Sequence, residues 1–456
     1  MKKLAVLILS ILMAFSIVGC SSSNQGAKSD IKVVSKVKGT VRLAFAGWQL
    51  NDGIDPITGE KNMGVKNFIK NEFQPRFPNI KIQVYQIPWQ NAQAKQTAML
   101  KSGDVDVMYT AGAYAAQWNQ QGLLKDISGL IKNDKSFDPN IYLQGVMNNS
   151  YSTKSPDKKA QFGIPSVLGQ YETIYDKKIF DEWGVEPLSD TATPQEVLEK
   201  AKKMTGKNPK TGKQNYGLWW EGASLNDTTF VALASYYHAT GGTGTIDDPK
   251  NIKWNLNSPE MVKVMTWLKE ASKYAPDAFV NNKGMENFGQ EKNNNVAIGL
   301  DQNGSGIMGL IKGGASKDLL KRYKPAMNIG EGGRGWVAVD PFVMAKDAKN
   351  EKASWEVLKF FTSYTTQKYA YKNFGFTPTL AKPDFLDQDD QYTKTALKLA
   401  AISKTSLLDE ANPYFSSQMI PAINGFISKA HDGNAPDIKT FLDNLQKSAE
   451  KWSAQQ

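Results

Sequence analysis

Aromatic side chains stand close to carboxylates and amides at the predicted ends of strands and in the loops that follow them. A pyranose ring offers apolar C–H faces that pack on aromatic rings, and hydroxyl edges that need both hydrogen-bond donors and acceptors. This combination of side chains is therefore typical of a cleft that binds a carbohydrate. The candidate binding residues are Trp48, Tyr114, Tyr171, Glu172, Trp219, Trp220, Glu221, Asp301, Asn303, Trp336 and Asp340.

Each of these residues also has a structural alternative, because an aromatic side chain at a strand end is often part of the core. Trp219 and Trp220 are adjacent, so in an extended strand they point to opposite faces and only one of them can line a cleft. Four other tryptophans fall within helical patterns, and we expect them to pack in the core. They are Trp118, Trp183, Trp267 and Trp355.

Catalytic and cofactor signals are weak in this chain. The segment 304–309 matches the pattern G-x-G-x-x-G after a predicted strand, which is typical of dinucleotide sites. No clean strand with an acidic end follows at the distance that such a site requires. A glycine-rich helix start can equally present free N–H groups to sugar hydroxyls. We therefore expect no cofactor.

Candidate metal ligands are few. The segment Asn51–Asp55, followed by Glu60, carries oxygen ligands without the spacing of a calcium loop, so a polar turn is favoured and calcium binding stays open. The chain has only two histidines, His238 and His431, which limits both a histidine metal site and a Ser-His-Asp triad. We expect neither, and we expect His431 to lie superficially near a helix end.

The N-terminus reads as an export signal. Lys2 and Lys3 precede an apolar run, Leu4–Val18, that is shorter than the roughly 20 residues of a membrane span. It ends at Ile17–Cys20, which resembles the lipobox of bacterial lipoproteins, and Cys20 is the only cysteine. We expect a signal peptide over 1–19 and two acyl chains on Cys20, which together give stable anchoring. The alternative is an uncleaved N-terminus with an incidental cysteine.

Composition limits the remaining classes. A single cysteine excludes an intramolecular disulfide, so the 456 residues must be stabilised by apolar cores, and 41% hydrophobic residues can supply them. The formal charge of +10 is spread along the chain without a basic block, which disfavours nucleic-acid binding. Residues 20–38 have the polar composition of a flexible linker.

Structure is predicted from Gly39 onward. Apolar residues alternate over 41–45 and 80–84, helical patterns cover 65–73 and 90–101, and a short apolar strand spans 105–109. This β-α-β-α-β order predicts a parallel sheet whose ligand lies beyond the carboxyl ends of the strands. That rule places Trp48, Thr110 and Tyr114 on one rim.

A second α/β segment starts near Phe162. Strands are expected over 164–167, 173–175, 216–220, 296–300 and 336–343, and helices over 193–204, 258–273, 353–373 and 438–452. Thr193 is predicted to cap its helix ahead of Pro194, with Glu196 completing a capping box.

The order of four groups of residues resembles the sugar-binding family of ABC-importer solute-binding proteins that includes maltose-binding protein. The resemblance covers nearly all of the chain after Gly39. It is carried by Lys101–Val107 with Gly122–Ile127, by Gly163–Pro165 through Ile174–Phe180, by Val296–Gly299, and by Ala353–Trp355 through Gly375–Pro378.

The resemblance implies an α/β, two-lobed periplasmic-binding-protein-like fold, in which each lobe is a mainly parallel sheet flanked by helices. Lobe one would comprise 39–165 and 331–376, and lobe two 166–330 and 377–456. Three crossings would form the hinge, near Ile164–Leu168, Glu331–Asp340 and Phe374–Pro378, each a Gly- or Pro-containing stretch.

The resemblance also carries over individual residues. Tyr114 would lie in the binding loop of lobe one, and Tyr171 with Glu172 would follow the first crossing. Asp301 and Asn303 would lie in a strand-end loop of lobe two, and Trp336 at the second crossing. The insertion Asn51–Gly64 is longer than the loop that the family has there, so the resemblance is a weaker guide to residue roles at that rim.

The expected function is capture of a carbohydrate by a membrane-anchored, monomeric, non-enzymatic protein that delivers it to membrane permease subunits. Two alternatives remain: an importer component for a peptide or another polar solute, and a surface glycoside hydrolase with two carboxylates about 5 to 10 Å apart. The sugar itself, including its charge, stays open.

Overall fold

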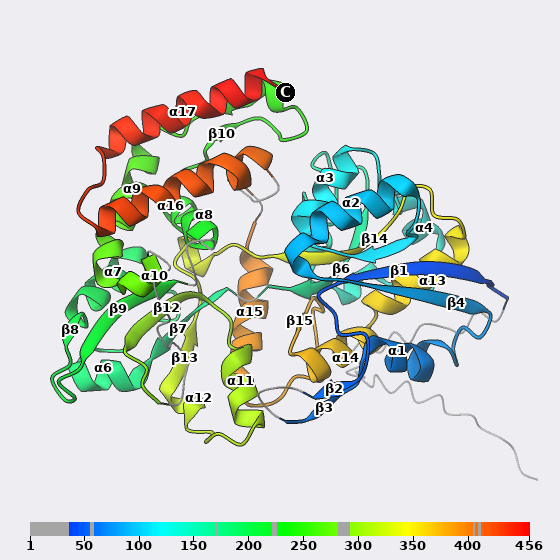
Figure 1. Ribbon diagram of the computed structural model, residues 1–456, viewed down its shortest axis with the longest axis horizontal. Coiled ribbons are helices and arrows are strands. Elements are labelled where there is room, and N and C mark those ends of the chain that lie inside the picture. The colour runs from blue at the N-terminus through cyan, green and yellow to red at the C-terminus, as the bar shows by residue number, and fades with distance from the viewer. Residues whose placement is uncertain are drawn as a thin grey trace, which may run out of the picture.

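The computed structural model describes residues 36–54, 59–169, 171–220, 226–280, 292–404, 406–408 and 412–456. The predicted signal peptide, Cys20 and most of the predicted linker lie outside these residues. Two α/β lobes stand side by side, each built around one sheet with its own apolar core (Figure 1).

Lobe one is a six-stranded sheet in the order β15-β6-β14-β5-β1-β4. The predicted alternation in β1 is confirmed, because Val41, Leu43 and Phe45 are fully buried. β1 pairs in parallel with both β4 and β5, as predicted for the first three strands. The strands are β1 (Gly39–Ala46), β4 (Ile80–Ile87), β5 (Val107–Tyr109), β6 (Gly163–Leu168), β14 (Val339–Met344) and β15 (Thr377–Pro378).

Helices cover both faces of this sheet (Figure 1). They are α1 (Val65–Phe68), α2 (Ala92–Ser102), α3 (Gly112–Gln120), α4 (Ser128–Asn133), α5 (Gln144–Met147), α13 (Glu351–Thr362) and α14 (Tyr364–Phe374). The sequence predicts one helix over 353–373, and this is wrong: the chain breaks at Ser363, which adopts an extended ψ of 165°. Its hydroxyl accepts a hydrogen bond from Thr366 N and so caps α14.

Lobe two is a five-stranded sheet in the order β13-β7-β12-β9-β8. Its strands are β7 (Glu172–Asp176), β8 (Gly206–Lys207), β9 (Gln214–Trp220), β12 (Val296–Gln302) and β13 (Tyr323–Ala326). Its helices are α6 (Lys177–Trp183), α7 (Pro194–Lys203), α8 (Asn226–Tyr237), α9 (Pro259–Ala271), α10 (Asp277–Val280), α11 (Ser305–Lys312), α12 (Leu319–Arg322), α16 (Ile420–His431) and α17 (Ile438–Ala454). Two short hairpins complete the fold: β2 (Gly53–Ile54) with β3 (Lys61–Asn62), and β10 (Gly242–Thr243) with β11 (Lys253–Trp254).

Both sheets are mixed, which corrects the expectation of mainly parallel sheets. In lobe one, β14 runs antiparallel to both β5 and β6, and β15 runs antiparallel to β6. In lobe two only β12 and β9 are parallel. In lobe one the parallel pairs join the three consecutive strands linked by helices, whereas β14 and β15 return only after the chain has passed through lobe two.

The predicted cap of α7 is confirmed, but its partner acts differently. Thr193 Oγ1 accepts a hydrogen bond from Glu196 N at 3.1 Å, and Pro194 is the first helical residue. The Glu196 carboxylate instead accepts hydrogen bonds from the backbone N and the hydroxyl of Ser189. Ser258 caps α9 in the same way as Thr193 caps α7.

Three of the four helical tryptophans pack in the core with their indole N–H satisfied, as expected. Trp118 donates to Thr97 Oγ1, Trp267 to the carbonyl of Pro194, and Trp355 to Asp134 Oδ2. Trp183 is only partly buried against the core of lobe two.

The chain passes between the lobes three times. It crosses between β6 and β7, again between β13 and β14, and finally beyond β15. The third crossing lies further along the chain than Phe374–Pro378, because β15 still pairs with β6 and both Leu380 and Phe385 are buried in the core of lobe one. Helix α15 (Gln391–Ile402) follows it and contacts elements of both lobes.

Candidate functional site

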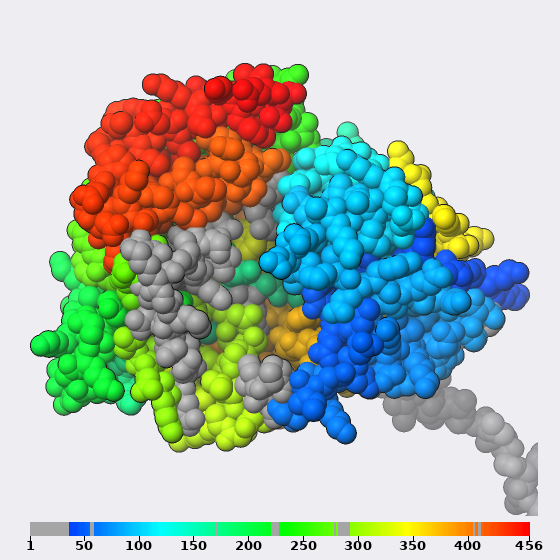
Figure 2. Space-filling view, viewed as in Figure 1, coloured from blue at the N-terminus to red at the C-terminus, as the bar shows by residue number. Residues whose placement is uncertain are grey.

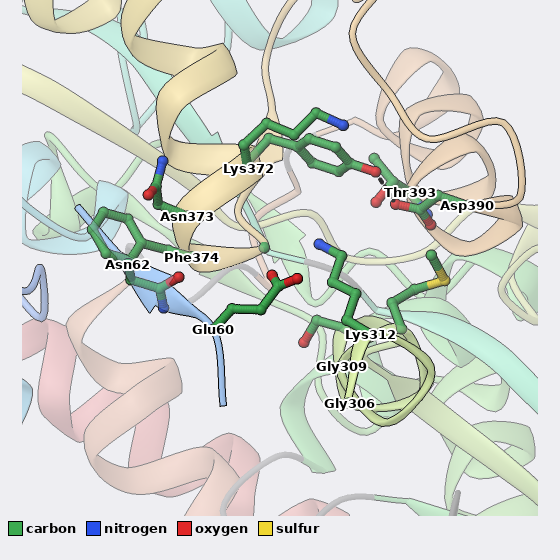
Figure 3. A pocket seen from close by; sticks show the side chains of 14 residues that line it. Glu60, Asn62, Gly306, Gly309, Lys312, Lys372, Asn373, Phe374, Asp390 and Thr393 are labelled. Carbon is green, nitrogen blue, oxygen red and sulfur yellow. Dashed lines mark hydrogen bonds between the residues drawn. The ribbon is translucent and has the colours of Figure 1, made fainter. Parts of the chain in front are cut away.

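A cavity of about 180 Å³ opens between the lobes. Lobe one contributes hairpin β2–β3 and the end of α14, and lobe two contributes α11; the start of α15 closes it from the hinge side (Figure 3). The molecular surface is visibly hollowed between the lobes (Figure 2). A ligand held here touches both lobes, as a hinged binding protein requires.

Glu60 and Asn62, near the end of the insertion 51–64, line this cavity on the side of lobe one. Its end is fixed to α14, because Met63 N donates to Asn373 Oδ1 at 2.9 Å and Tyr369 OH donates to Met63 O at 2.7 Å. Asp52 Oδ1 accepts from Gly64 N at 2.8 Å, which closes the loop on itself. The segment is therefore a built part of the cleft. Asp55, one of the candidate calcium ligands, lies outside the described residues.

Helix α11 starts at the wall of lobe two, and its glycines serve close approach. A Cβ on Gly304 would lie 2.1 Å from Tyr392 Cγ, so only glycine fits there. Asn303 Oδ1 accepts from Ser305 N at 2.8 Å and so satisfies one free N–H of the first turn. Gly306 lines the cavity with open space where a side chain would be. The glycine pattern thus makes a helix that packs closely on α15 and leaves room beside it.

Charged groups around the cavity are largely balanced. Asp387 pairs with Lys372 and lies 4.0 Å from Lys312. Tyr371 OH donates to Asp390 Oδ2 at 2.7 Å, and burial together with the Asp390 charge raises the pKa of this phenol above its usual range. Glu60 points into the same space from the hairpin (Figure 3). The lining offers hydrogen-bonding groups of both kinds with little net charge, which suits an uncharged polar ligand.

Trp48, a predicted binding residue, lies in the core of lobe one. It is fully buried, and its ring centroid lies 5.2 Å from that of Phe45 and 5.4 Å from that of Tyr109. Trp48 is therefore a core residue, which is the structural alternative given for aromatic side chains at strand ends.

Glu172 is fully buried in β7, at the foot of α11. Among the described residues neither carboxyl oxygen has a hydrogen-bond partner. Burial raises the pKa of this carboxyl to about 8, and the nearby charge of Asp390 adds to the rise. At neutral pH the group is therefore mostly protonated and uncharged.

Asp301 and Asn303 end the same strand but have different surroundings. Asp301 is 1% exposed, with a φ of +53°, and its carboxylate accepts hydrogen bonds from Thr229 Oγ1 and from Asn328 Nδ2 at 3.0 Å. Asn303 is exposed, and its Oδ1 accepts from Ser305 N in the turn that leads into α11. The structure thus makes Asp301 an internal tie of lobe two and leaves Asn303 at the surface beside the cavity.

Tyr171 and Trp336 meet where the first two crossings run together. Their ring centroids lie 4.9 Å apart, and Trp336 is 8% exposed. Asn328 Nδ2 donates to the carbonyl of Tyr171 at 2.7 Å. The pair joins two of the three hinge segments.

Asp340 and Tyr114 lie at the rim of lobe one. Asp340 Oδ2 accepts from Tyr109 OH at 3.0 Å, and desolvation raises the pKa of Asp340 to about 7. Tyr114 is half-buried on α3, 6.1 Å from the ring of Trp118.

The two adjacent tryptophans end β9, and Trp219 packs half-buried against the core of lobe two. The side chain of Trp220 and the whole of Glu221 lie outside the described residues.

Sequence reasoning missed Lys312 and Tyr371, which line the cavity, and Trp89, an exposed aromatic beyond the carboxyl end of β4. Trp89 follows Pro88 at the carboxyl end of β4 and is 43% exposed, with its ring 6.1 Å from that of Tyr109. Its position relative to β4 matches that of Trp48 relative to β1, and this signal could have found it. Lys312 and Tyr371 belong to helices far apart in sequence, so no local pattern reveals them.

Among the described residues, no helix has both the length and the apolar composition needed to cross a membrane.

The family model described as bacterial extracellular solute-binding protein matches residues 60–368, which is more than half of the chain.

Solved structures share the fold at low sequence identity. The sugar-binding protein MalE from Xanthomonas citri is 14% identical with a TM-score of 0.71, covering 91% of this chain and 98% of that chain. An ABC substrate-binding protein from Listeria monocytogenes in complex with cycloalternan is 18% identical with a TM-score of 0.62, covering 91% and 99%. A solute-binding protein from Agrobacterium radiobacter in complex with ribitol is 18% identical with a TM-score of 0.66, covering 92% and 100%.

The match of the family model and the shared two-lobed architecture lead to one assignment. The chain belongs to the bacterial extracellular solute-binding proteins, the non-enzymatic solute-binding components of ABC transporters.

Proposed function

We propose that this protein captures a carbohydrate between its lobes and delivers it to the permease of an ABC importer, while a lipid on Cys20 holds it at the outer face of the cytoplasmic membrane. The observation that carries the proposal is the cavity whose walls come from both lobes and are lined by hydroxyls, amides and mutually paired charges. Such a lining matches the many hydroxyls of a neutral sugar.

The relatives support the same ligand class. Proteins of this fold have been solved with cycloalternan and with ribitol, so it accommodates both an oligosaccharide and a sugar alcohol. Because the family is non-enzymatic, the surface glycoside hydrolase considered from the sequence is no longer a candidate. A non-sugar polar solute remains as an outcome of the binding test.

We assign the contacts as follows. Trp89, Tyr114 and Trp220 provide apolar faces for sugar rings. Asn62 and Ser305 form hydrogen bonds with sugar hydroxyls from opposite walls of the cavity. Asp301 acts from beneath the surface by fixing a strand end, because its buried carboxylate accepts hydrogen bonds from Thr229 and Asn328.

Closure follows from contacts made by both walls. A ligand shifts the equilibrium between an open and a closed form only by its difference in affinity for the two. Hydrogen bonds from lobe two are added to those from lobe one only when the lobes approach. Closure is then the state that a permease distinguishes.

The binding test uses a panel of neutral oligosaccharides, uronate oligosaccharides, polyols and short peptides, with thermal shift and product analysis run together. A stabilising shift with a neutral glycan or polyol and no product supports the proposal. A shift with peptides alone, or release of sugar product, contradicts it.

Membrane attachment has its own test. Cys20→Ala should move the protein from the membrane fraction to the soluble fraction, because the acyl chains have no other thiol to occupy. A Cys20→Ala variant that stays with the membrane as fully as the parent would contradict lipid anchoring.

A further inference from the structure

A cluster of three potential metal ligands lies in lobe two, on elements that do not line the interlobe cavity. His431 is the last residue of α16, Asp432 follows it, and Asp277 is the first residue of α10 (Figure 1). One imidazole nitrogen and one carboxylate oxygen from each aspartate lie within 4.8 Å of one another. The sequence predicts no metal site here, because Asp277 lies far from the other two residues along the chain.

The imidazole of His431 is held in the form that a metal requires. Its Nδ1 lies 2.7 Å from the carbonyl oxygen of Ser272, and a carbonyl can only accept, so Nδ1 carries the proton. In the neutral ring the lone pair then belongs to Nε2. Ligating histidines are typically oriented in this way by a backbone carbonyl or carboxylate behind the ring.

The spacing in front of the ring fits a bound ion better than a direct hydrogen bond. Nε2 lies 3.7 Å from Asp277 Oδ1, which exceeds hydrogen-bond distance. Two ligands on a tetrahedral zinc ion, each about 2.0 to 2.1 Å from the metal, are about 3.3 to 3.4 Å apart. A shift of a few tenths of an ångström brings this pair to that spacing.

The local charge also favours a cation. Two carboxylates face one imidazole, and the group stands at the C-terminal end of the 12-residue helix α16, where the helix dipole is negative. The side chain of His431 is 17% exposed while both aspartates are exposed, so an ion reaches the group from solvent onto an anchored ring.

We propose that His431 Nε2, Asp277 and Asp432 bind a divalent transition ion of the Zn²⁺ class. One imidazole and two carboxylates form a nitrogen–oxygen ligand set that suits such ions better than Ca²⁺ or Mg²⁺, which prefer oxygen alone. Water fills the remaining position. The ion links the start of α10 to the end of α16. It is a structural ion that stabilises lobe two and takes no part in the solute cleft.

The test titrates full-length protein without a histidine tag with Zn²⁺ by calorimetry and with Co²⁺ by visible absorption. One saturable site per chain is expected, together with the intense absorption of four-coordinate Co²⁺ and a Zn²⁺-dependent rise in melting temperature. Absence of saturable binding in the parent would overturn the proposal.

Substitutions identify the ligands. His431→Gln should lose this site, while His238→Gln, which changes the only other histidine, should keep it. Asp277→Asn and Asp432→Asn should each weaken Zn²⁺ binding at least tenfold. The melting temperature of each variant, measured with a chelator that removes bound metal, shows whether the substitution itself harms folding. Equal binding by the His431→Gln variant and the parent, or parental affinity in both asparagine variants, would refute the three-ligand site.

Discussion

The two ends of the interlobe cleft are built in opposite ways. At the hollow end, the cavity between hairpin β2–β3, α11, α14 and α15, polar and charged groups surround open space. At the packed end, α3 of lobe one meets the loop after β10 of lobe two, and Ala116, Tyr151, Ile246 and Leu407 form one apolar cluster across the lobes. Figure 1 shows these ends on opposite sides of the hinge helix α15.

The packed end also carries one polar tie. Gln120 Nε2 donates to Asp247 Oδ1 at 3.0 Å in an exposed hydrogen bond, and partial desolvation raises the pKa of Asp247. The contrast teaches that the lobes touch directly at one end, whereas the other end leaves groups from both lobes facing a space. We propose that the polar contacts of the ligand are made at the hollow end.

The largest effect, on the free energy of unfolding, is expected at Glu172, which is buried in β7. Its folded-state pKa of about 8 lies above the ordinary 4.5, so the folded protein keeps a proton that the unfolded chain releases. Stability from this group is fully present below pH 4.5 and is lost as the pH rises toward 8. Glu172→Gln removes this loss and should raise the free energy of unfolding by about 4 kcal/mol at pH 8, with little change at pH 4.5.

Urea unfolding of the parent and of Glu172→Gln at both pH values measures this. Asp340→Asn provides a second case with a smaller expected gain, because the pKa of Asp340 is about 7. An equal stability difference at pH 4.5 and pH 8 would show that Glu172 is not protonated in the folded state.

The next largest effect is expected from a substitution that fills the cavity at the hollow end. Gly306 lies on α11 with open space around its Cβ direction, so Gly306→Phe should occupy the cavity without disturbing the helix. Solute affinity should fall at least a hundredfold, or about 2.7 kcal/mol. Gly425→Phe is the matched control, because Gly425 is an exposed helical glycine of α16 with equally open space. Calorimetry that finds unchanged affinity in Gly306→Phe would place the ligand elsewhere.

A smaller effect is expected at the rim of lobe one. Trp89→Ala should weaken solute binding by about 1 to 2 kcal/mol through loss of an aromatic face. The melting temperature should hold, because the ring is 43% exposed. Tyr85→Ala removes a similarly exposed aromatic from β4, the strand that leads to Trp89, and should leave affinity unchanged. Equal losses in both variants would remove Trp89 from the binding surface.

The smallest effect belongs to the packed end. Gln120→Ala removes the hydrogen bond to Asp247, which is solvent-exposed, so solute affinity should change by less than about 1 kcal/mol, or about fivefold. Asn119→Ala on the same helix is the control. A loss beyond tenfold in Gln120→Ala alone would mean that the packed end takes part in recognition.

Local patterns predicted the elements well, for reasons of short-range chemistry. The alternation of Val41, Leu43 and Phe45 defined β1, and Thr193 and Ser258 capped their helices as expected. Ser363 shows the limit, because a serine that caps one helix can also sit inside a continuous helical pattern.

The site was less predictable than the elements. Trp48 and Trp89 both follow strands, yet one is fully buried and the other is 43% exposed, because β1 has a strand on each side whereas β4 lies at the edge of the sheet. The cavity joins Asn62, Lys312 and Tyr371 from three distant segments. Only the packing of one lobe against the other brings them together, and spacing along the chain does not encode it.

The central claim is that a solute bound at the hollow end draws the lobes together. Small-angle scattering of the parent, with and without a solute shown to bind by thermal shift, tests it most directly. The account predicts a smaller radius of gyration at saturation, and no such change in Gly306→Phe under the same conditions. An unchanged radius in the saturated parent would contradict closure as the outcome of binding.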